Sequence, residues 1–201
     1  MEAVNKLQIG RFIKIASITI LGTLLLTISA KVKIPFYPVP MTMQTFVVLF
    51  LGIALGPKIG LATVTLYLLE GIFGLPVFAN SPEKGVGLIY FTGPTMGYLI
   101  GFLVAVYFAG FRTDLKVWIF GDYFQFLHWS KKIYLNVFTR LLFSVSFIYI
   151  LGLLWLGTLI GWDKPIFKLG AQPFLLAELF KLILLTILYP WIEKINIKLF
   201  R

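Results

Sequence analysis

The feature that most limits how this chain can fold is a series of long apolar runs separated by short polar or proline-rich stretches. A helix needs about 20 mainly apolar residues to cross a bilayer. Apolar residues make up 59% of the 201 residues and charged residues only 13%, a balance that a water-soluble domain of this size cannot bury. The sequence therefore predicts an all-α integral membrane protein, a single domain over residues 1–201 built as a bundle of six transmembrane helices. The expected spans are 12–30, 41–56, 58–78, 94–111, 135–160 and 172–191.

Proline and glycine set the expected limits of these helices. The segment Lys31–Pro40 contains three prolines in six positions, which excludes a helix and predicts an extended loop. Gly56 and Pro57 mark a tight turn between the second and third spans, with the proline in the first turn of the next helix. Gly97 and Gly101 are spaced so that another helix can approach the fourth span closely.

The distribution of basic residues predicts the orientation. An even number of spans places both termini on one side, and eleven Lys and Arg residues fall on that side against five on the other. By the positive-inside rule both termini are cytoplasmic, in a multi-pass protein of the cell (plasma) membrane. The proline-rich loop and the loops 80–93 and 161–171 then face outward. Segment 112–134 is too polar to span and too aromatic to be a free linker, so it is expected at the membrane surface. Contact with anionic lipid accounts for the net charge of +10 without a nucleic-acid partner.

Ionisable residues inside apolar spans are costly and are therefore candidates for function. Glu178 and Lys181 lie three residues apart on the sixth span and share a helix face. Counted from Gln172 at a rise of 1.5 Å per residue, they lie about 9 and 13 Å inside the outer end. The pair is interpreted either as the polar base of a ligand-binding site or as an ion pair that only stabilises the helix bundle. Glu70 is expected to be protonated or paired with Lys181 or another cation, and a structural or gating role is favoured over a contact with the ligand. Arg140 lies near the cytoplasmic end of its span, where it can reach the interface.

Two roles are possible for each of the other polar residues. Thr42 either caps the second helix or, with Gln44, faces a ligand, and Asn80 is a turn former or a ligand contact. No catalytic, metal or cofactor site is predicted, because His128 is the only histidine and no zinc-protease, nucleophile-elbow or phosphate-loop motif occurs. The absence of cysteine excludes disulfides and thiolate ligands. An intramembrane enzyme using Glu70 and Glu178 and a purely structural subunit remain alternatives.

Five segments occur together in an order that resembles one known family. This is the BioY family, the biotin-specific substrate-binding (S) components of energy-coupling factor (ECF) transporters. The matching segments are Ile34–Thr45, Gly56-Pro57, Tyr67–Ala79, Gly93–Phe102 and Pro173–Lys181.

The resemblance implies biotin uptake, with the vitamin held near the external face below the first loop. It implies that the fused-ring head of biotin contacts Asn80, Glu178 and Lys181. Residues of the other matching segments are expected to contribute to the same site, namely Gln44, Thr42 and Tyr98. The resemblance also implies a membrane coupling subunit (EcfT-like) and two ATPase subunits (EcfA-like). A transporter for another small vitamin is the alternative within this class.

The chain departs from the family pattern at four places. Glu178 stands where an Asp is usual, Met96 where a Gly is usual, and Glu70 where an apolar residue is usual. The stretch Thr19–Thr23 replaces the small Ala-x-x-x-Ala surface with which the first helix of such proteins contacts the coupling subunit.

Overall fold

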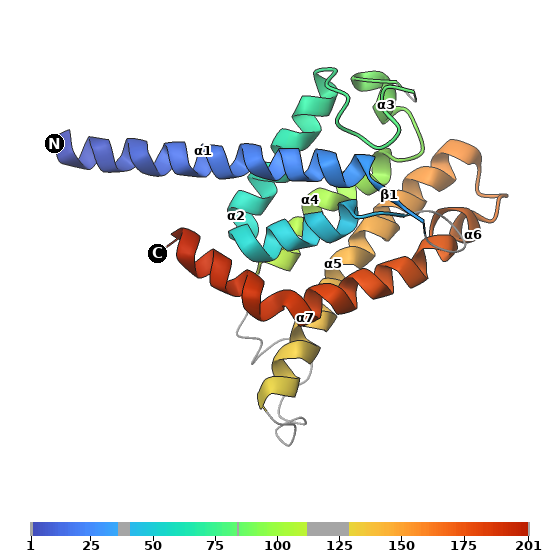
Figure 1. Cartoon of the computed structure of the whole chain (residues 1–201). Helices are drawn as coiled ribbons and strands as arrows, with labels where there is room; N and C mark the ends of the chain where they lie inside the picture. The colour runs from blue at the N-terminus through green and yellow to red at the C-terminus, as the bar shows by residue number, and fades with distance from the viewer. Residues whose placement is uncertain (1, 36–40, 84, 112–128, 201) are drawn as a thin grey trace.

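The computed structural model describes residues 2–35, 41–83, 85–111 and 129–200. Helices account for most of this part of the chain, and the only strands described form a two-stranded antiparallel ribbon in which Lys33 pairs with Thr42. The elements, coloured along the chain in Figure 1, are α1 (Glu2–Lys31), β1 (Lys33–Ile34), β2 (Met41–Thr42), α2 (Gln44–Ile72), α3 (Leu88–Phe91), α4 (Met96–Gly110), α5 (Trp129–Ile160), α6 (Ile166–Gly170), the 3-10 turn η1 (Gln172–Phe174) and α7 (Leu175–Phe200).

Helix α2 is broken at Gly56, as the Gly56-Pro57 step predicts. Gly56 has a φ of 78° and a ψ of 172°, a conformation that glycine adopts without steric cost. The break leaves carbonyls at the end of the first half-helix without helical partners. Asn196 of α7 meets this need, because its Nδ2 donates to the Ala54 carbonyl oxygen at 2.9 Å and to the Ile53 carbonyl oxygen at 3.5 Å.

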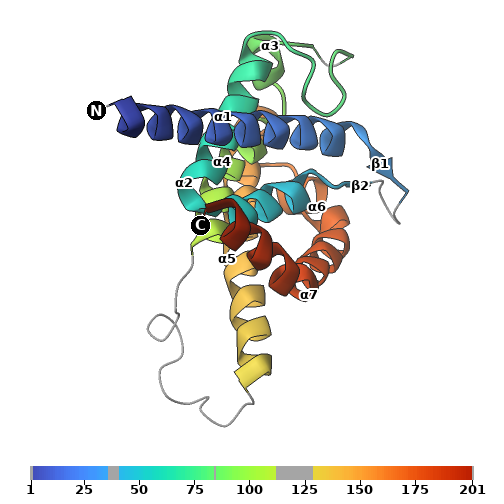
Figure 2. The same ribbon diagram turned by 60° about the vertical axis from the view of Figure 1, so that its left-hand side comes forward.

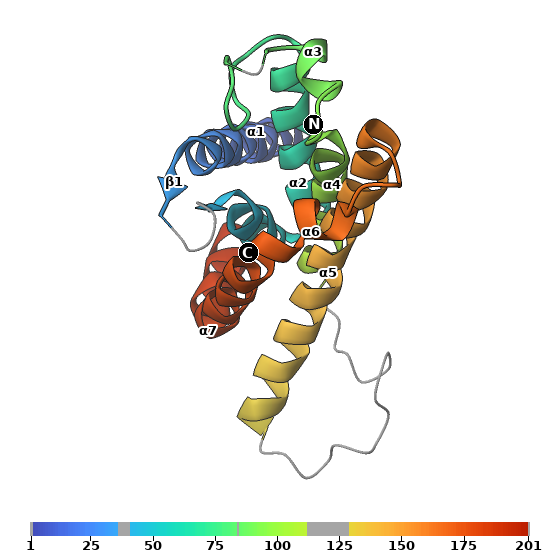
Figure 3. The same ribbon diagram turned by 90° about the vertical axis from the view of Figure 1, so that its right-hand side faces the viewer.

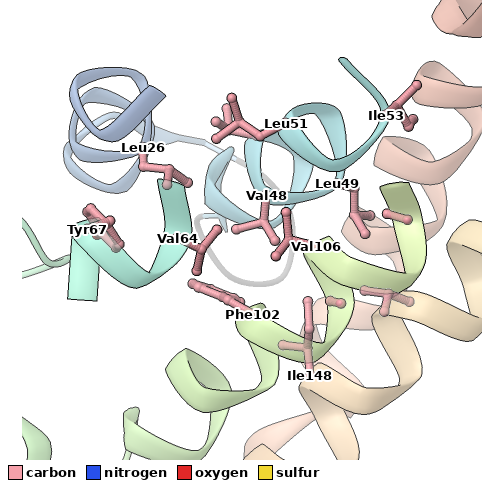
Figure 4. Packing of buried hydrophobic residues seen from close by; sticks show 14 of the residues in the cluster. Leu26, Val48, Leu49, Leu51, Ile53, Val64, Tyr67, Phe102, Val106 and Ile148 are labelled. Atoms are coloured by element: carbon pink, nitrogen blue, oxygen red, sulfur yellow. The ribbon is translucent and has the colours of Figure 1, made fainter. Parts of the chain in front are cut away.

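Helix α4 packs between α2 and α5, and glycines allow its backbone to approach both. A Cβ atom added at Gly97 would lie 2.3 Å from the Leu151 carbonyl oxygen, and one at Gly101 would lie 2.6 Å from Ile148 Cα. The close helix approach expected from this glycine spacing is therefore confirmed. Helices α1 and α7 pack against α2. Figure 4 shows the resulting apolar core, which joins the helices through Leu26, Val48, Leu49, Val64, Phe102, Val106 and Ile148.

Several boundaries differ from the sequence-based expectation. α1 begins at Glu2, α5 begins at Trp129, and α7 continues to Phe200 through Pro190. The helices extend beyond the apolar runs because polar residues with good helix propensity continue them. The third span ends at Ile72, since Gly74 takes a φ of 95° just beyond it. The loops at 80–93 and 161–171 contain the short helices α3 and α6.

The expected surface segment 112–134 is only partly testable. Residues 112–128 lie outside the described residues, and 129–134 form the start of α5. The candidate span in α5 begins at Ile133, so the surface location of this segment stays a prediction. Among the described residues, four helical stretches are long and apolar enough to cross a membrane: Gln8–Lys31, Gln44–Ile72, Ile133–Ile160 and Ile166–Asn196. α4 is a shorter apolar helix. These lengths fit a multi-pass membrane protein.

Both ends of the chain lie at the same end of the molecule. In Figures 1 and 2 the N- and C-terminal labels both lie to the left of the β1–β2 ribbon and α6, although they are well separated from each other. Figure 3 looks onto the opposite end, where the start of α2 lies between α1 and α7 with β1 beside it. We call this the ribbon end of the molecule. The candidate site residues gather there, because it holds the last residue of α1 and the first turns of α2 and α7.

Candidate ligand-binding site

The centre of the candidate site is a buried ion pair on α7 that also binds the start of α2. Lys181 Nζ lies 2.8 Å from Glu178 Oε1. The Thr45 hydroxyl donates to Glu178 Oε1 at 2.8 Å and accepts from Lys181 Nζ at 2.9 Å. Glu178 is 6% exposed and Lys181 is 3% exposed. The shared helix face expected for these two residues is confirmed, and Thr45 is a third member that sequence spacing does not indicate.

The second oxygen of the same carboxylate is buried without a partner. Glu178 Oε2 makes no hydrogen bond to any described residue. Tyr149 of α5 lies within side-chain hydrogen-bonding reach of this carboxylate and interacts with it electrostatically. A buried acceptor that stays unpaired loses the hydrogen bonds it would make with water. The site therefore has one acceptor oxygen that a ligand donor can satisfy.

The local helix structure favours a carboxylate at this position. Glu178 lies in the first turn of α7, where the unpaired N–H groups of a helix start favour negative charge. Because α7 begins at Leu175 and not at Gln172, Glu178 and Lys181 lie about 4 and 9 Å along the helix. The candidate membrane span extends over Ile166–Asn196, so the depth of Glu178 and Lys181 below the outer end stays a prediction.

A second hydrogen-bond chain starts at Gln44, the neighbour of Thr45. Gln44 Nε2 donates to the Tyr67 hydroxyl at 2.9 Å, and that hydroxyl donates to the Val77 carbonyl oxygen at 3.0 Å. Gln44 and Tyr67 are both buried. The first turn of α2 therefore connects to α7 through Thr45 and, through Gln44, to the turn 77–81 that carries Asn80.

The turn 77–81 is held by its backbone and by two neighbouring elements. Asn80 adopts a φ of 57°, which Asn tolerates better than most residues, so the turn-forming reading of Asn80 is confirmed. Lys31 donates to the carbonyl oxygen and the hydroxyl of Ser81. Tyr90 donates to the Ala79 carbonyl oxygen at 2.7 Å. Burial raises the pKa of Tyr90 above its ordinary value, so the phenol keeps the proton that it donates. The half-buried Asn80 side chain makes no hydrogen bond among the described residues.

Two further predicted residues lie apart from the ion pair. Thr42 belongs to β2, and the residue that precedes α2 is Met43, with no side-chain cap; the prediction that Thr42 caps the helix is wrong. The Tyr98 hydroxyl donates to the Gly170 carbonyl oxygen at 2.9 Å, which fastens α4 to α6. The Tyr98 ring also contacts Tyr149 edge to face, with centroids 6.1 Å apart. Tyr98 therefore reaches the surroundings of Glu178 only through Tyr149.

The other ionisable residues of the spans are not part of this cluster. Glu70 is half-buried near the end of α2 and makes no hydrogen bond or ion pair with any described residue. Of the alternatives for Glu70, pairing with Lys181 is wrong, because Lys181 pairs with Glu178. Arg140 donates to the Phe111 carbonyl oxygen and lies 5.5 Å from the centroid of the Tyr189 ring. No group of three or more metal-ligating side chains occurs in the described part of the chain.

Sequence reasoning missed Thr45, Tyr67 and Tyr149 as members of the site. Thr45 and Tyr67 stand inside the matching segments, so the resemblance covers them, but their hydroxyl partners are distant in sequence. Tyr149 lies in no matching segment and gives no sequence signal.

Similar proteins agree on one family. Residues 4–197 match the model of the BioY family. The chain belongs to the BioY family. The probable biotin transporter BioY of Pyrococcus horikoshii is 32% identical over 84% of this chain and 89% of its own. The biotin transporter BioY of Thermotoga maritima is 31% identical over 88% of this chain and 94% of its own.

A solved structure supports the BioY fold. The crystal structure of the S-component for biotin from an ECF-type ABC transporter covers 92% of this chain and 93% of its own, with a TM-score of 0.68 at 24% identity. The architecture expected from the resemblance, a helical S-component bundle, is thus confirmed at the level of the fold.

Proposed function

We propose that this BioY-family chain is the membrane-embedded biotin-binding subunit of a vitamin uptake system. The observation that carries the proposal is the buried carboxylate oxygen Glu178 Oε2, which makes no hydrogen bond of ordinary geometry to a described residue and belongs to a carboxylate paired with a buried ammonium group. Such a set suits a small neutral ring that offers both donors and acceptors. The chain belongs to the BioY family, and its relatives are named as biotin transporters. Biotin, which contains such a ring, is therefore the ligand that we propose.

The chemistry of the ureido ring fits these groups. Biotin offers two N–H donors and one carbonyl oxygen on this ring, so one N–H can donate to Glu178 Oε2. Lys181 has three N–H donors and uses two of them on Thr45 and Glu178, which leaves one for the ureido oxygen. The Asn80 side chain supplies a further donor and acceptor from the turn 77–81. Aromatic walls suit the apolar thiophane ring, and we assign Gln44, Thr42 and Tyr98 to the supporting surroundings.

The proposal includes topology and partners. We assign six membrane crossings, one each to α1, α4, α5 and α7 and two to α2, whose halves meet at Gly56. The chain is treated as a single domain over 1–201 in the plasma membrane, with cytoplasmic termini and the ribbon end outside. It has no phosphate-binding loop, so a membrane coupling subunit and two ATPase subunits would power import, in keeping with the ECF-type transporter of the similar S-component.

The competing enzyme hypothesis has less support. It requires Glu70 and Glu178 to act together, but Glu178 is paired with Lys181 and no contact joins it to Glu70. The relatives described above are named as transporters.

Calorimetric titration of the purified full-length protein in detergent tests the proposed function. We expect saturable binding of one biotin per chain and recovery of radiolabelled biotin unchanged. Absence of saturable binding would refute the biotin assignment, with binding of a different vitamin identifying the alternative ligand. Conversion of the label to a new compound would show that the chain is an enzyme.

A further inference from the structure

The Thr45 hydroxyl occupies a position between the two charges of the candidate site. It belongs to the first turn of α2, whereas Glu178 and Lys181 belong to α7. Thr45 is 133 residues from Glu178 and 136 residues from Lys181 in sequence, so the three groups join two distant helices. No other described side chain makes a hydrogen bond to both charges.

The direction of each hydrogen bond in this triangle is fixed by chemistry. An ammonium group only donates, so Thr45 Oγ1 must accept from Lys181. A hydroxyl has one proton to give, and the Thr45 proton is therefore directed to Glu178 Oε1 at 2.8 Å. Glu178 Oε1 then accepts from both Thr45 and Lys181, which uses its two lone pairs.

This arrangement makes the two oxygens of the carboxylate unequal. Oε1 accepts two hydrogen bonds inside the protein, whereas Oε2 is buried and makes no hydrogen bond of ordinary geometry to a described residue. Without the Thr45 hydroxyl, Lys181 of the same helix and Tyr149 of α5 would remain beside the carboxylate, and neither would hold Oε1 toward the start of α2. The carboxylate could then turn so that Lys181 takes the oxygen that the ligand needs.

We infer that Thr45 is a positioning residue, whose hydroxyl holds Glu178 so that Oε2 is presented to a ligand N–H donor. This inference rests on the proposed function, since it names how the same site recognises the ureido group. It predicts that Thr45 contributes to affinity through Glu178 and not through a contact of its own with the ligand.

The test uses the full-length protein and calorimetric titration with biotin. Thr45→Val keeps the branched shape and removes the hydroxyl, and we expect biotin to bind about ten- to a hundredfold more weakly, as for the loss of a hydrogen bond to a charged group. Thr45→Ser restores the hydroxyl and should bind within about threefold of the parent. Thr45→Ala removes the hydroxyl with a smaller side chain and serves if the Val variant is unstable. Thr63→Val is the matched control, because the Thr63 hydroxyl on the same helix bonds only to its own backbone at Ile59.

A double-mutant cycle separates positioning from a purely structural role. If Thr45 acts through the carboxylate, Thr45→Val should change affinity by less than about threefold in a Glu178→Gln background. Multiplication of the two single-variant losses would overturn the inference, as would parent-like binding by folded Thr45→Val or Thr45→Ala, or failure of Thr45→Ser to restore affinity. Failure of the parent itself to bind biotin would instead overturn the proposed function. Thermal unfolding without ligand, measured for every variant, shows whether a loss of affinity follows a loss of fold.

Discussion

Glu178 and Lys181 form an ion pair that is expensive to bury. Removing two charges from water costs several kcal/mol per ion, and a hydrophobic pair of similar size is often as stable. The pair at 2.8 Å is therefore poorly explained as a device for stability alone. A requirement to bind a polar ligand explains both the charges and the oxygen that stays unpaired.

Removal of either charge should weaken biotin binding strongly. Truncating one partner of a buried, hydrogen-bonded charge pair costs about 2–5 kcal/mol, because the other charge is left unpaired. For Glu178→Ala and Lys181→Ala we expect affinity to fall by roughly thirty- to several-thousand-fold in calorimetric titrations. Lys164→Ala is the control, since the Lys164–Asp163 pair is exposed and such pairs contribute little.

The outcome that would contradict this assignment is equally specific. If both Ala variants fold as the parent does and bind biotin with the affinity of the parent, the pair only stabilises the packing of α7 against α2. Thermal unfolding without ligand distinguishes lost folding from lost binding. Glu178→Asp should keep measurable binding, because it retains the charge and shortens the side chain by one methylene.

Glu70 is predicted to lie outside the ligand contacts. It makes no bond to Lys181 or to any other described residue, and its neighbours on α2 include the exposed Leu69. Glu70→Gln keeps the shape and removes the ionisable group, so biotin affinity should stay within about tenfold, or 1.4 kcal/mol. A loss of more than a hundredfold in the same titration would move Glu70 into the site.

These residues show which contacts of the site could be predicted from sequence spacing alone. The i,i+3 separation of Glu178 and Lys181 places them on one face of any helix, so their pairing could be predicted. The role of Thr45 could not, because it depends on how the first turn of α2 packs against α7. The same holds for Tyr67 and Tyr149, whose hydroxyl groups meet partners on other elements or turns.

At the scale of elements, the close contact between α4 and α5 depends on glycines in α4, which have no side chain. A Cβ at Gly101 would lie 2.6 Å from Ile148 Cα, which is backbone and cannot move aside alone. Gly101→Ala should therefore lower the thermal unfolding temperature in detergent, by an amount typical of overpacking at about 1–3 kcal/mol. Gly10→Ala is the matched control, since a Cβ there meets nothing within 4 Å and alanine favours a helix. Equal melting of Gly101→Ala and the parent would show that the two helices separate readily.

The sequence predicted which segments form helices better than it predicted the residues at which those helices begin and end. Hydropathy marks the part of a helix that meets lipid, whereas the helix itself continues as long as backbone bonds and propensity allow. α7 continues through Pro190, although proline removes one helical hydrogen bond. The break in α2 was predictable because glycine and proline act locally. The hydrogen bonds from Asn196 to the end of its first half were not, since they cross 142 and 143 residues.

At the scale of the whole molecule, the arrangement of the two ends is consistent with an even number of crossings. The N- and C-terminal ends lie on the same side of the molecule in Figures 1 and 2, whereas Thr45, Glu178 and the turn 77–81 lie toward the ribbon end. This polarity separates a candidate ligand site on one side from the termini on the other. The positive-inside rule predicts that the termini face the cytoplasm, because the excess of Lys and Arg lies on their side.

Cysteine labelling in whole cells tests this orientation directly, because the chain contains no cysteine of its own. Lys164 lies between α5 and α6 and Lys58 lies just after the break in α2, and both side chains are exposed. With cytoplasmic termini, a membrane-impermeant maleimide should label Lys164→Cys in intact cells and Lys58→Cys only after permeabilisation. The reverse pattern would invert the protein in the membrane and place the Glu178 site inside the cell. Labelling of both variants in intact cells would show that the two positions lie on one side and that the assigned number of crossings between them is wrong.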